Sequence, residues 1–286
     1  MTLPGYEVPG KKYDLTYIAL GAGVQSSALL LMSNLGLYDV PRADVAIFAD
    51  TGAEPPDVYR VLEELEKASS IPVVRVQEGD LEADYRAGLA DKDKSFRSLP
   101  TYTMDPDTKK RGIVMRQCTA HWKIRPIHRY VREEMLGLKP RQRSRAVVLT
   151  MMGISFDEAQ RMKPSRVKWT DHSFPLVDRR IRREKCSAII EEHGGADGWP
   201  VKVGASSCYF CPFHGQNIWR AMKERDHIDG LFTRACEFDE AIRRHPRMRS
   251  ECFLHPSCKP LREVDLEPGP QMEFDFMGCD SGHCGI

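Results

Sequence analysis

A glycine-containing turn between an apolar strand and an apolar helix is the feature of this chain that most restricts its fold. Residues 14–20 are predicted to form a buried strand, and residues 24–36 are predicted to form a helix. Gly21 and Gly23 stand in the turn between these two segments. A strand that leads directly into a helix is typical of α/β proteins, in which helices cross over between parallel strands.

The same alternation continues along the chain. Further strands are predicted at residues 43–49, 72–76 and 145–151. Further helices are predicted at residues 55–68, 118–136, 155–163, 179–193, 214–224 and 227–245. Residues 91–115 are polar and irregular, as expected for a long functional loop. The expected fold is α/β, with a Rossmann-like parallel sheet and a mainly helical, cysteine-containing C-terminal part.

The glycine turn has the features of an anion-binding loop. Glycine lets the backbone approach a phosphate closely, and unpaired N–H groups at a helix N-terminus attract negative charge. The loop continues through Val24 and Gln25 to Ser26 and Ser27, whose hydroxyl groups add hydrogen-bond donors. There is no Walker ending, and Ser26 stands at the third glycine position of the dinucleotide pattern. An ordinary strand–helix turn is the alternative.

The cysteines indicate a metal centre or catalysis. The chain has nine cysteines, and the segment from Met1 to Lys12 lacks a hydrophobic leader, so we expect a reducing, cytoplasmic location. No apolar run approaches the roughly 18–20 residues that a membrane helix needs. Cys208 and Cys211 form a Cys-x-x-Cys-Pro segment, and Cys118 stands at a predicted helix start. Cys186 and Cys236 lie on predicted helices and are expected in the core, whereas Cys252 and Cys258 are weaker candidate ligands.

Positive charge is concentrated in the middle of the chain. Residues 109–183 contain 20 Lys or Arg and 6 Asp or Glu, whereas the segments on either side are net acidic. This imbalance favours an anionic ligand, and a nucleotide and a nucleic acid fit it equally well. The alternative is a set of solvated helix faces paired with acidic residues elsewhere.

These motifs together resemble a known superfamily. The Gly-x-Gly-Val-x-Ser-Ser segment after a strand resembles the PP-loop of the adenine nucleotide α-hydrolase superfamily, although Leu20 and Ala22 replace the usual Ser and second Gly. Asp50-Thr51-Gly52, at the end of the second strand, is similar to the Asp-Thr-Gly turn of the phosphoadenosine phosphosulfate (PAPS) reductase family. Cys118-Thr119, Trp122-Lys123 and Cys-x-x-Cys-Pro extend the resemblance over most of residues 14–215.

The resemblance implies roles for particular residues. It implies ATP or a related adenine nucleotide at residues 21–27, with Asp50 and Thr51 beside it and Asp50 near the ribose or a magnesium ion. Arg116 is expected to contact phosphate and Lys123 to lie near the substrate. Residues 1–165 would be the nucleotide-binding domain, and residues 166–286 would carry the cysteine loop and tail.

The same resemblance implies a 4Fe-4S iron–sulfur cluster with cysteine ligands. Cys118, Cys208 and Cys211 are the expected ligands, and Gln117 stands where related reductases have a second cysteine. Cys284, in the Cys-Gly near the C-terminus, is a candidate fourth ligand or a reactive catalytic thiol. Structural zinc is the alternative, because Cys-x-x-Cys serves both metals.

Three functions follow as hypotheses. The first is a PP-loop sulfurtransferase that cleaves ATP between the α- and β-phosphates, adenylates an oxygen and replaces it with sulfur; the acceptor could be tRNA, DNA or a metabolite, and the sulfur donor stays open. The second is a reductase of PAPS or adenylyl sulfate, with Cys284 as the nucleophile. The third is a binding protein that senses nucleotide or redox state.

Overall fold

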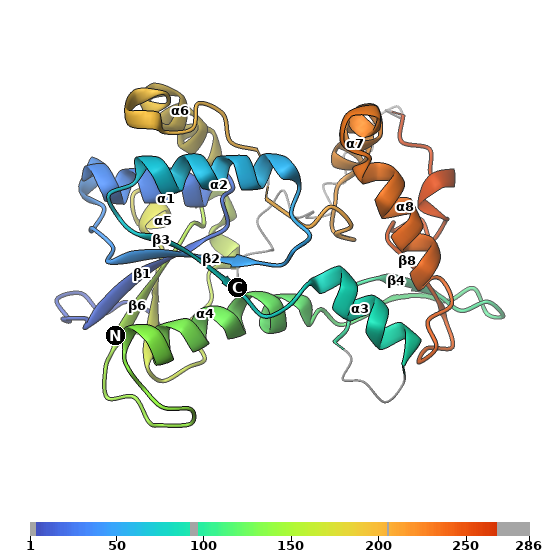
Figure 1. Cartoon of the computed structure of the whole chain (residues 1–286), viewed down its shortest axis with the longest axis horizontal. Coiled ribbons are helices and arrows are strands. Elements are labelled where there is room, and N and C mark those ends of the chain that lie inside the picture. Colours follow the sequence, from blue (N-terminus) through green and yellow to red (C-terminus); the bar gives the residue numbers. More distant parts are fainter. Residues whose placement is uncertain (1–3, 92–96, 205, 268–286) are drawn as a thin grey trace.

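The computed structural model describes residues 4–91, 97–204 and 206–267 (Figure 1). Cys284, the candidate fourth ligand or catalytic thiol in the C-terminal Cys-Gly, lies outside the described residues.

A five-stranded parallel sheet forms the centre of the larger part of the molecule, with the order β3-β2-β1-β6-β7. Its strands are β1 (Leu15–Leu20), β2 (Val45–Asp50), β3 (Val73–Gln77), β6 (Val148–Met152) and β7 (Thr170–Ser173). The predicted α/β class with a Rossmann-like sheet is confirmed. The strand order reverses between β1 and β6, and open sheets of this kind bind ligands beyond the carboxyl ends of the strands at such a point.

Helices cover both faces of this sheet (Figure 1). On one face lie α1 (Val24–Leu35), α2 (Pro56–Ala68) and α6 (Arg183–His193), and their apolar side chains share a core with Ile18 of β1. On the other face lies α4 (Arg125–Tyr130), extended at both ends by π-helical turns at Thr119–Ile124 and Val131–Met135. Short helical turns complete this part, at Leu37–Asp39, Phe156–Arg161, α5 (Pro175–Asp178) and Ala196–Gly198.

A smaller part lies beside the sheet and has its own core (Figure 1). It contains α3 (Leu81–Ala90), α7 (Gln216–Asp229), α8 (Leu231–Ile242) and a turn at Leu261–Glu263. A three-stranded antiparallel sheet joins them, in the order β5 (Arg111–Ile113), β4 (Tyr102–Met104) and β8 (Glu251–Phe253). Trp219 and Phe238 are fully buried there, as is Cys236.

The two parts do not follow the predicted boundary at residue 165. β7 and α6 come after that residue, yet β7 is an edge strand of the large sheet and α6 packs on α1. Conversely, α3 and β4 come before it and share a core or a sheet with the C-terminal elements. Long-range pairing therefore assembles the smaller part from two separate stretches of the chain.

Most predicted elements are present with shifted ends. The helix opened by the proline pair ends at Ala68 as expected, the helix predicted at 118–136 is continuous from Thr119 to Met135, and the helix predicted from 179 begins at Arg183. The segment 91–115, predicted as irregular, contains β4 and β5. Within the described residues, no helix is long and apolar enough to cross a membrane.

Candidate functional site

The glycine loop lies at the carboxyl end of β1, next to the point where the strand order reverses. Gly23 is the N-cap of α1 and makes no side-chain capping bond, and the first turn of the helix has no acidic residue. Ser26 closes the loop internally, because its Oγ accepts the Gly21 N–H at 3.1 Å and donates to the Gly23 carbonyl at 3.2 Å. The first N–H groups of α1 therefore form an uncapped helix N-terminus of the kind that attracts anions.

Neighbouring segments approach this loop so closely that side chains would not fit. A Cβ added to Gly23 would lie 2.7 Å from Ser206 Oγ, and one added to Gly153, which follows β6, would lie 2.8 Å from the Cα of Ser26. A Cβ added to Gly21 would likewise lie only 3.2 Å from Ser206 Oγ. The loop is thus enclosed by the end of β6 on one side and by the segment that leads to Cys208 on the other.

Gln25 connects α1 to a buried charged cluster. Its Nε2 donates to Glu158 at 3.2 Å, and its Oε1 accepts from Arg183 at 3.1 Å. Glu158 also pairs with Arg161, and both of these side chains are less than a tenth exposed. Burial raises the pKa of Glu158, although Arg161 and Arg183 oppose that shift. Two arginines therefore stand beside the first turn of α1.

Sequence reasoning missed this cluster. Glu158 and Arg161 lie on one short helical turn, and Arg183 begins a helix 22 residues further on, so only tertiary packing brings them to Gln25. The i,i+3 spacing of Glu158 and Arg161 was the available signal. Of the other predicted loop residues, Val24 packs in the core, and Ser27 is buried with no hydrogen-bond partner for its hydroxyl among the described residues.

Asp50 has the local role of capping a turn. Its Oδ1 accepts the Gly52 N–H at 2.8 Å and the Tyr59 hydroxyl at 2.7 Å. This is the turn-forming contact typical of an Asp at a strand end. Its expected place beside a nucleotide or a magnesium ion stays a prediction.

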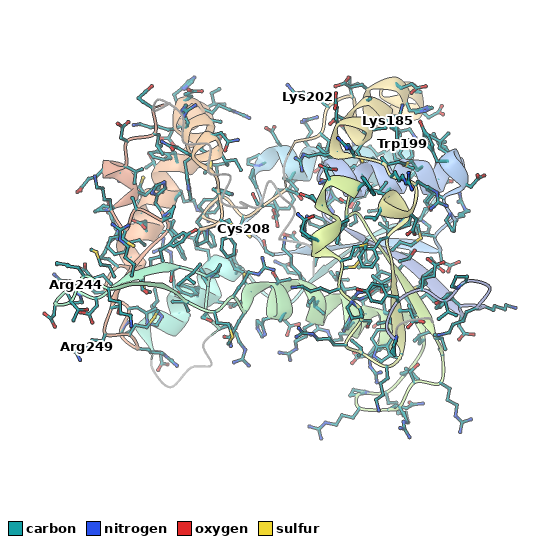
Figure 2. The ribbon with its side chains drawn as sticks, turned by 180° about the vertical axis from the view of Figure 1, so that it is seen from behind. Lys185, Trp199, Lys202, Cys208, Arg244 and Arg249 are labelled. Atoms are coloured by element: carbon teal, nitrogen blue, oxygen red, sulfur yellow. The ribbon has the colours of Figure 1, made fainter. Side chains whose placement is uncertain are left out.

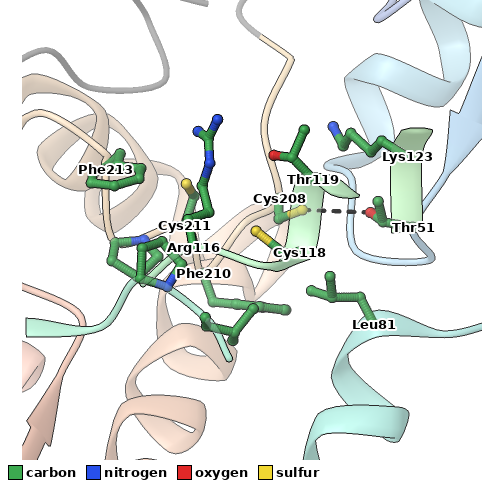
Figure 3. Close-up of a pocket in the computed structure, with 13 residues that line it drawn as sticks. Thr51, Leu81, Arg116, Cys118, Thr119, Lys123, Cys208, Phe210, Cys211 and Phe213 are labelled. Carbon is green, nitrogen blue, oxygen red and sulfur yellow. Dashed lines mark hydrogen bonds between the residues drawn. The ribbon is translucent and has the colours of Figure 1, made fainter. Parts of the chain in front are cut away.

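The three predicted thiols line one pocket (Figure 3). The cavity has a volume of about 30 Å³ and an almost entirely apolar lining. Its walls are Thr51, Leu81, Leu99, Pro100, Arg116, Cys118, Thr119, Lys123, Cys208, Phe210, Cys211, Pro212 and Phe213. The cysteine loop, the start of the helix at Thr119 and the end of β2 thus converge on a single space.

A chain of polar contacts leads out of this pocket. Thr51 Oγ1 lies 3.5 Å from Cys208 Sγ and donates to Glu54 Oε1 at 3.3 Å. Lys123 Nζ forms an ion pair with the same Glu54 oxygen at 3.1 Å, and the Glu54 side chain is only 1% exposed. Thr51, expected beside the nucleotide, is therefore linked through Glu54 to Lys123, and both Thr51 and Lys123 line the thiol pocket.

Arg116 lies at the pocket rather than at the glycine loop. Its guanidinium lies over the Phe213 ring, 5.8 Å from the ring centre. Figure 3 shows Arg116 and Lys123 extending toward the same side of the pocket. Two cationic side chains therefore flank this side, where an anionic group would be stabilised.

The cysteine loop is fixed by contacts to both parts of the molecule. The Tyr209 N–H donates to the Ala53 carbonyl at 2.9 Å, and the Tyr209 hydroxyl donates to Glu82 of α3. The Cys211 N–H closes a turn onto the Cys208 carbonyl at 2.9 Å. Figure 2 shows Cys208 between the two parts. The loop is therefore positioned at their junction.

The pocket fits a metal centre in its donor chemistry, because thiolate sulfur is the preferred ligand of zinc and of iron–sulfur clusters. Among the described residues, however, no three His, Cys, Asp or Glu side chains are close enough together to hold a metal ion. Cys252 and Cys258 do not line the pocket; their sulfurs face Met248 and the Thr103 carbonyl.

The remaining candidates behave as structural residues. Cys186 and Cys236 are fully buried, and burial raises the pKa of Cys186 to about 12 and that of Cys236 to about 11. Trp122 and Trp219 are buried as well. The predicted core positions of these two cysteines are confirmed.

The glycine loop and the thiol pocket adjoin, because Ser206, which contacts both loop glycines, stands two residues before Cys208.

A comparison with models of known protein families finds no match for this chain, and a comparison with curated proteins finds none either.

Proposed function

We propose that this chain is a nucleotide-dependent enzyme of sulfur chemistry, in which ATP binds at the glycine loop and an iron–sulfur cluster binds at the thiol pocket. One observation carries the proposal: Ser206 packs on Gly21 and Gly23, and the same short segment delivers Cys208 to Thr51. The glycine loop and the thiol pocket therefore share one edge of the parallel sheet. Joint use of both by one reaction is the simplest account of this adjacency.

The phosphates would be held by the N-terminus of α1. The uncapped N–H groups of its first turn would donate to them, and Arg161 and Arg183 would offset their negative charge from beside Gln25. Glu158 pairs with Arg161 and Gln25 accepts from Arg183, so both arginines are held before a nucleotide arrives. Preorganised cations of this kind stabilise charge that develops on a leaving pyrophosphate.

The proposed reaction has two displacements. An oxygen of the acceptor attacks the α-phosphorus, and the bond to the β-phosphate oxygen breaks with release of pyrophosphate. Sulfur at the oxidation level of sulfide then attacks the acceptor carbon that carries the adenylated oxygen. The bond between that carbon and the oxygen breaks, and AMP leaves with the oxygen. Arg116 and Lys123, beside the pocket, would neutralise the anionic groups of both steps.

Cys118, Cys208 and Cys211 would hold the cluster, which when bound supplies a place to bind or activate sulfur. The largely apolar surface of the pocket would limit the access of water to that sulfur. Thr51 would orient Cys208 through the contact between its hydroxyl and the thiol. Zinc at the same thiols is the competing assignment, and it would serve folding alone.

A combined metal and turnover experiment tests the proposal. The full chain is purified without oxygen, its iron and zinc are measured and its visible spectrum is recorded. We expect iron with sulfide-to-iron absorption, and formation of AMP and pyrophosphate from ATP. Zinc at full occupancy without iron would refute the cluster. Release of sulfite from PAPS or adenylyl sulfate, without ATP cleavage, would identify a reductase instead.

Two cysteine variants sharpen the metal assignment. Cys118→Ser and Cys208→Ser should each lower bound iron several-fold, whereas Cys236→Ser, in the core of α8, should retain it. Retention of iron in both pocket variants would show that the metal lies elsewhere. Nucleotide binding without any turnover, unchanged by Cys118→Ser, would instead identify a sensing protein.

A further inference from the structure

The surface opposite the thiol pocket is strongly basic. β1, β6 and β7 begin at the same level of the sheet, because Leu15 is paired with Val148 and Val148 with Thr170. The segments that precede these strands therefore lie side by side along the amino end of the sheet. Together they carry nine exposed cations, which we call the basic edge: Lys11, Lys12, Lys139, Arg141, Arg143, Arg145, Lys163, Arg166 and Lys168.

Few acidic groups offset this charge. Asp171 pairs with Lys11 at 2.7 Å, and Asp14 accepts the Val147 N–H. Within the described part of the chain, the other eight cations of the basic edge form no ion pair. Exposed Glu133 and Glu134, on the turn that ends the α4 helix, are the nearest acidic residues in sequence to the basic connection at 139–145. The basic edge therefore has a large unbalanced positive charge.

The connection that carries four of these cations is anchored at its base. Figure 1 shows it extending beyond the sheet, between α4 and β6. The Arg132 guanidinium donates to the Gln142 carbonyl and lies over the Trp169 ring, and the Leu138 N–H donates to the Arg132 carbonyl. A connection held in this way presents its charges at set positions, which lowers the entropy lost on binding.

We infer that the basic edge binds the phosphate backbone of a nucleic acid. The cations are spread over three adjacent segments, as an extended polyanion requires, and four are arginines, whose planar guanidinium groups match phosphate oxygens. Apart from Met135 at its margin, the exposed large apolar side chains of the described residues lie in other segments, so an anionic membrane would gain little apolar burial here. Backbone contacts of this kind position a nucleic acid without reading its sequence.

The binding does not depend on the chemistry proposed for the pocket. The strands place the basic edge roughly 15–20 Å from their carboxyl ends, since each residue advances a strand by about 3.3 Å. Loss of ATP cleavage should therefore leave nucleic-acid binding intact. The two proposals can consequently fail separately.

Fluorescence anisotropy with the full chain tests the inference. The probes are a short labelled DNA duplex and a labelled RNA hairpin, titrated over a range of salt concentrations. We expect micromolar affinity at low salt that weakens steeply as salt rises, because condensed counterions are released on binding. Binding to both probes or to only one of them supports the inference, and the second result identifies the type of nucleic acid.

A matched pair of triple variants localises the binding. Lys139→Gln, Arg143→Gln and Lys168→Gln together remove three charges from the basic edge and should weaken binding about tenfold or more at low salt. The control triple Lys223→Gln, Arg244→Gln and Lys259→Gln removes the same number of positive charges from exposed positions of the smaller part. It should change the affinity less than twofold. Equal effects of the two triples would overturn the inference.

Vesicles provide the last comparison. Phosphatidylcholine vesicles with and without phosphatidylserine are assayed by co-sedimentation with the full chain. Binding to anionic vesicles in the absence of binding to either nucleic-acid probe would overturn the inference in favour of a lipid surface.

Discussion

The hydroxyl of Thr51 lies 3.5 Å from the thiol of Cys208, although 157 residues separate them in the chain. Thr51 follows β2 in the parallel sheet, and Cys208 belongs to the loop that enters the smaller part. This contact therefore joins the carboxyl end of the sheet to the cysteine loop. It makes the position of Cys208 depend on the turn after β2, and thus on Glu54 and Lys123.

The ion pair between Lys123 and Glu54 should contribute strongly to stability. The Glu54 side chain is 1% exposed and that of Lys123 is 16% exposed, so replacement of Lys123 would leave a buried carboxylate without its cation. We expect Lys123→Met to lower the free energy of unfolding by about 3–5 kcal/mol. Urea unfolding measures this change.

An exposed ion pair supplies the control. Arg60 and Glu64 pair at 2.8 Å on α2 with side chains 54% and 32% exposed, and Arg60→Met should cost only about 0.5 kcal/mol. Adding Glu54→Gln to Lys123→Met should restore part of the loss, because the buried charge is removed. Similar effects of Lys123→Met and Arg60→Met would show that burial does not govern the pair.

The close approach of Gly153 to α1 predicts a steric effect. A Cβ at residue 153 would lie 2.8 Å from both the N and the Cα of Ser26, which are backbone atoms that cannot rotate away. We expect Gly153→Ala to lower the free energy of unfolding by about 1–3 kcal/mol and to weaken ATP binding by moving the start of α1. Gly204→Ala is the control, since a Cβ there meets nothing within 4 Å. An unchanged urea midpoint for Gly153→Ala would argue against this packing.

Much of this architecture follows from local sequence signals. The β1 to β3 region was predictable because apolar runs, the glycine turn and the proline pair each define structure within a few neighbouring residues. β4 and β8 were not, because each is only three residues long and Tyr102 pairs with Phe253, 151 residues further along the chain. Short strands of this kind have no periodicity, and only tertiary packing selects their partners.

The candidate site divides in the same way. The glycine loop and the three thiols carry local motifs, and the structure brings them to adjoining positions. Arg183 and Glu54 could not be predicted in the same way, because no local motif marks their roles. Those roles depend on contacts with Gln25 and Lys123, which lie in distant segments. Arg116 lies over Phe213 beside the thiol pocket, and its expected contact with phosphate stays a prediction.

Histidine burial predicts a pH dependence of stability. Burial, helped by the charges of His172 and Arg132, lowers the pKa of His128 to about 4 beside the Trp169 ring. An unfolded histidine has a pKa of about 6.5, so between these values the unfolded chain binds a proton that the folded chain does not. Stability should therefore fall as the pH drops from 6.5 toward 4, by about 2 kcal/mol at pH 5 from this group alone.

A substitution isolates that contribution. His128→Phe keeps an aromatic ring against Trp169 and removes the titrating group, so the difference in unfolding free energy between pH 7 and pH 5 should shrink by about 2 kcal/mol. The exposed His227 provides the comparison, and His227→Gln should keep the pH dependence of the parent chain. The same pH dependence in His128→Phe as in the parent would assign the effect to other groups.

Arg183 offers a direct test of the nucleotide site, because it reaches the first turn of α1 through Gln25 at 3.1 Å. A charge-assisted hydrogen bond is worth about 1.5–3 kcal/mol, so Arg183→Gln should weaken ATP binding by roughly 10- to 150-fold in calorimetric titration. Bound iron should stay unchanged, since Arg183 does not line the thiol pocket. Lys185→Gln, an exposed change two residues further along α6, should leave the affinity within twofold. Equal affinities for the Arg183 and Lys185 variants would place the phosphates away from α1, whereas selective loss in Arg183→Gln would locate them at its N-terminus.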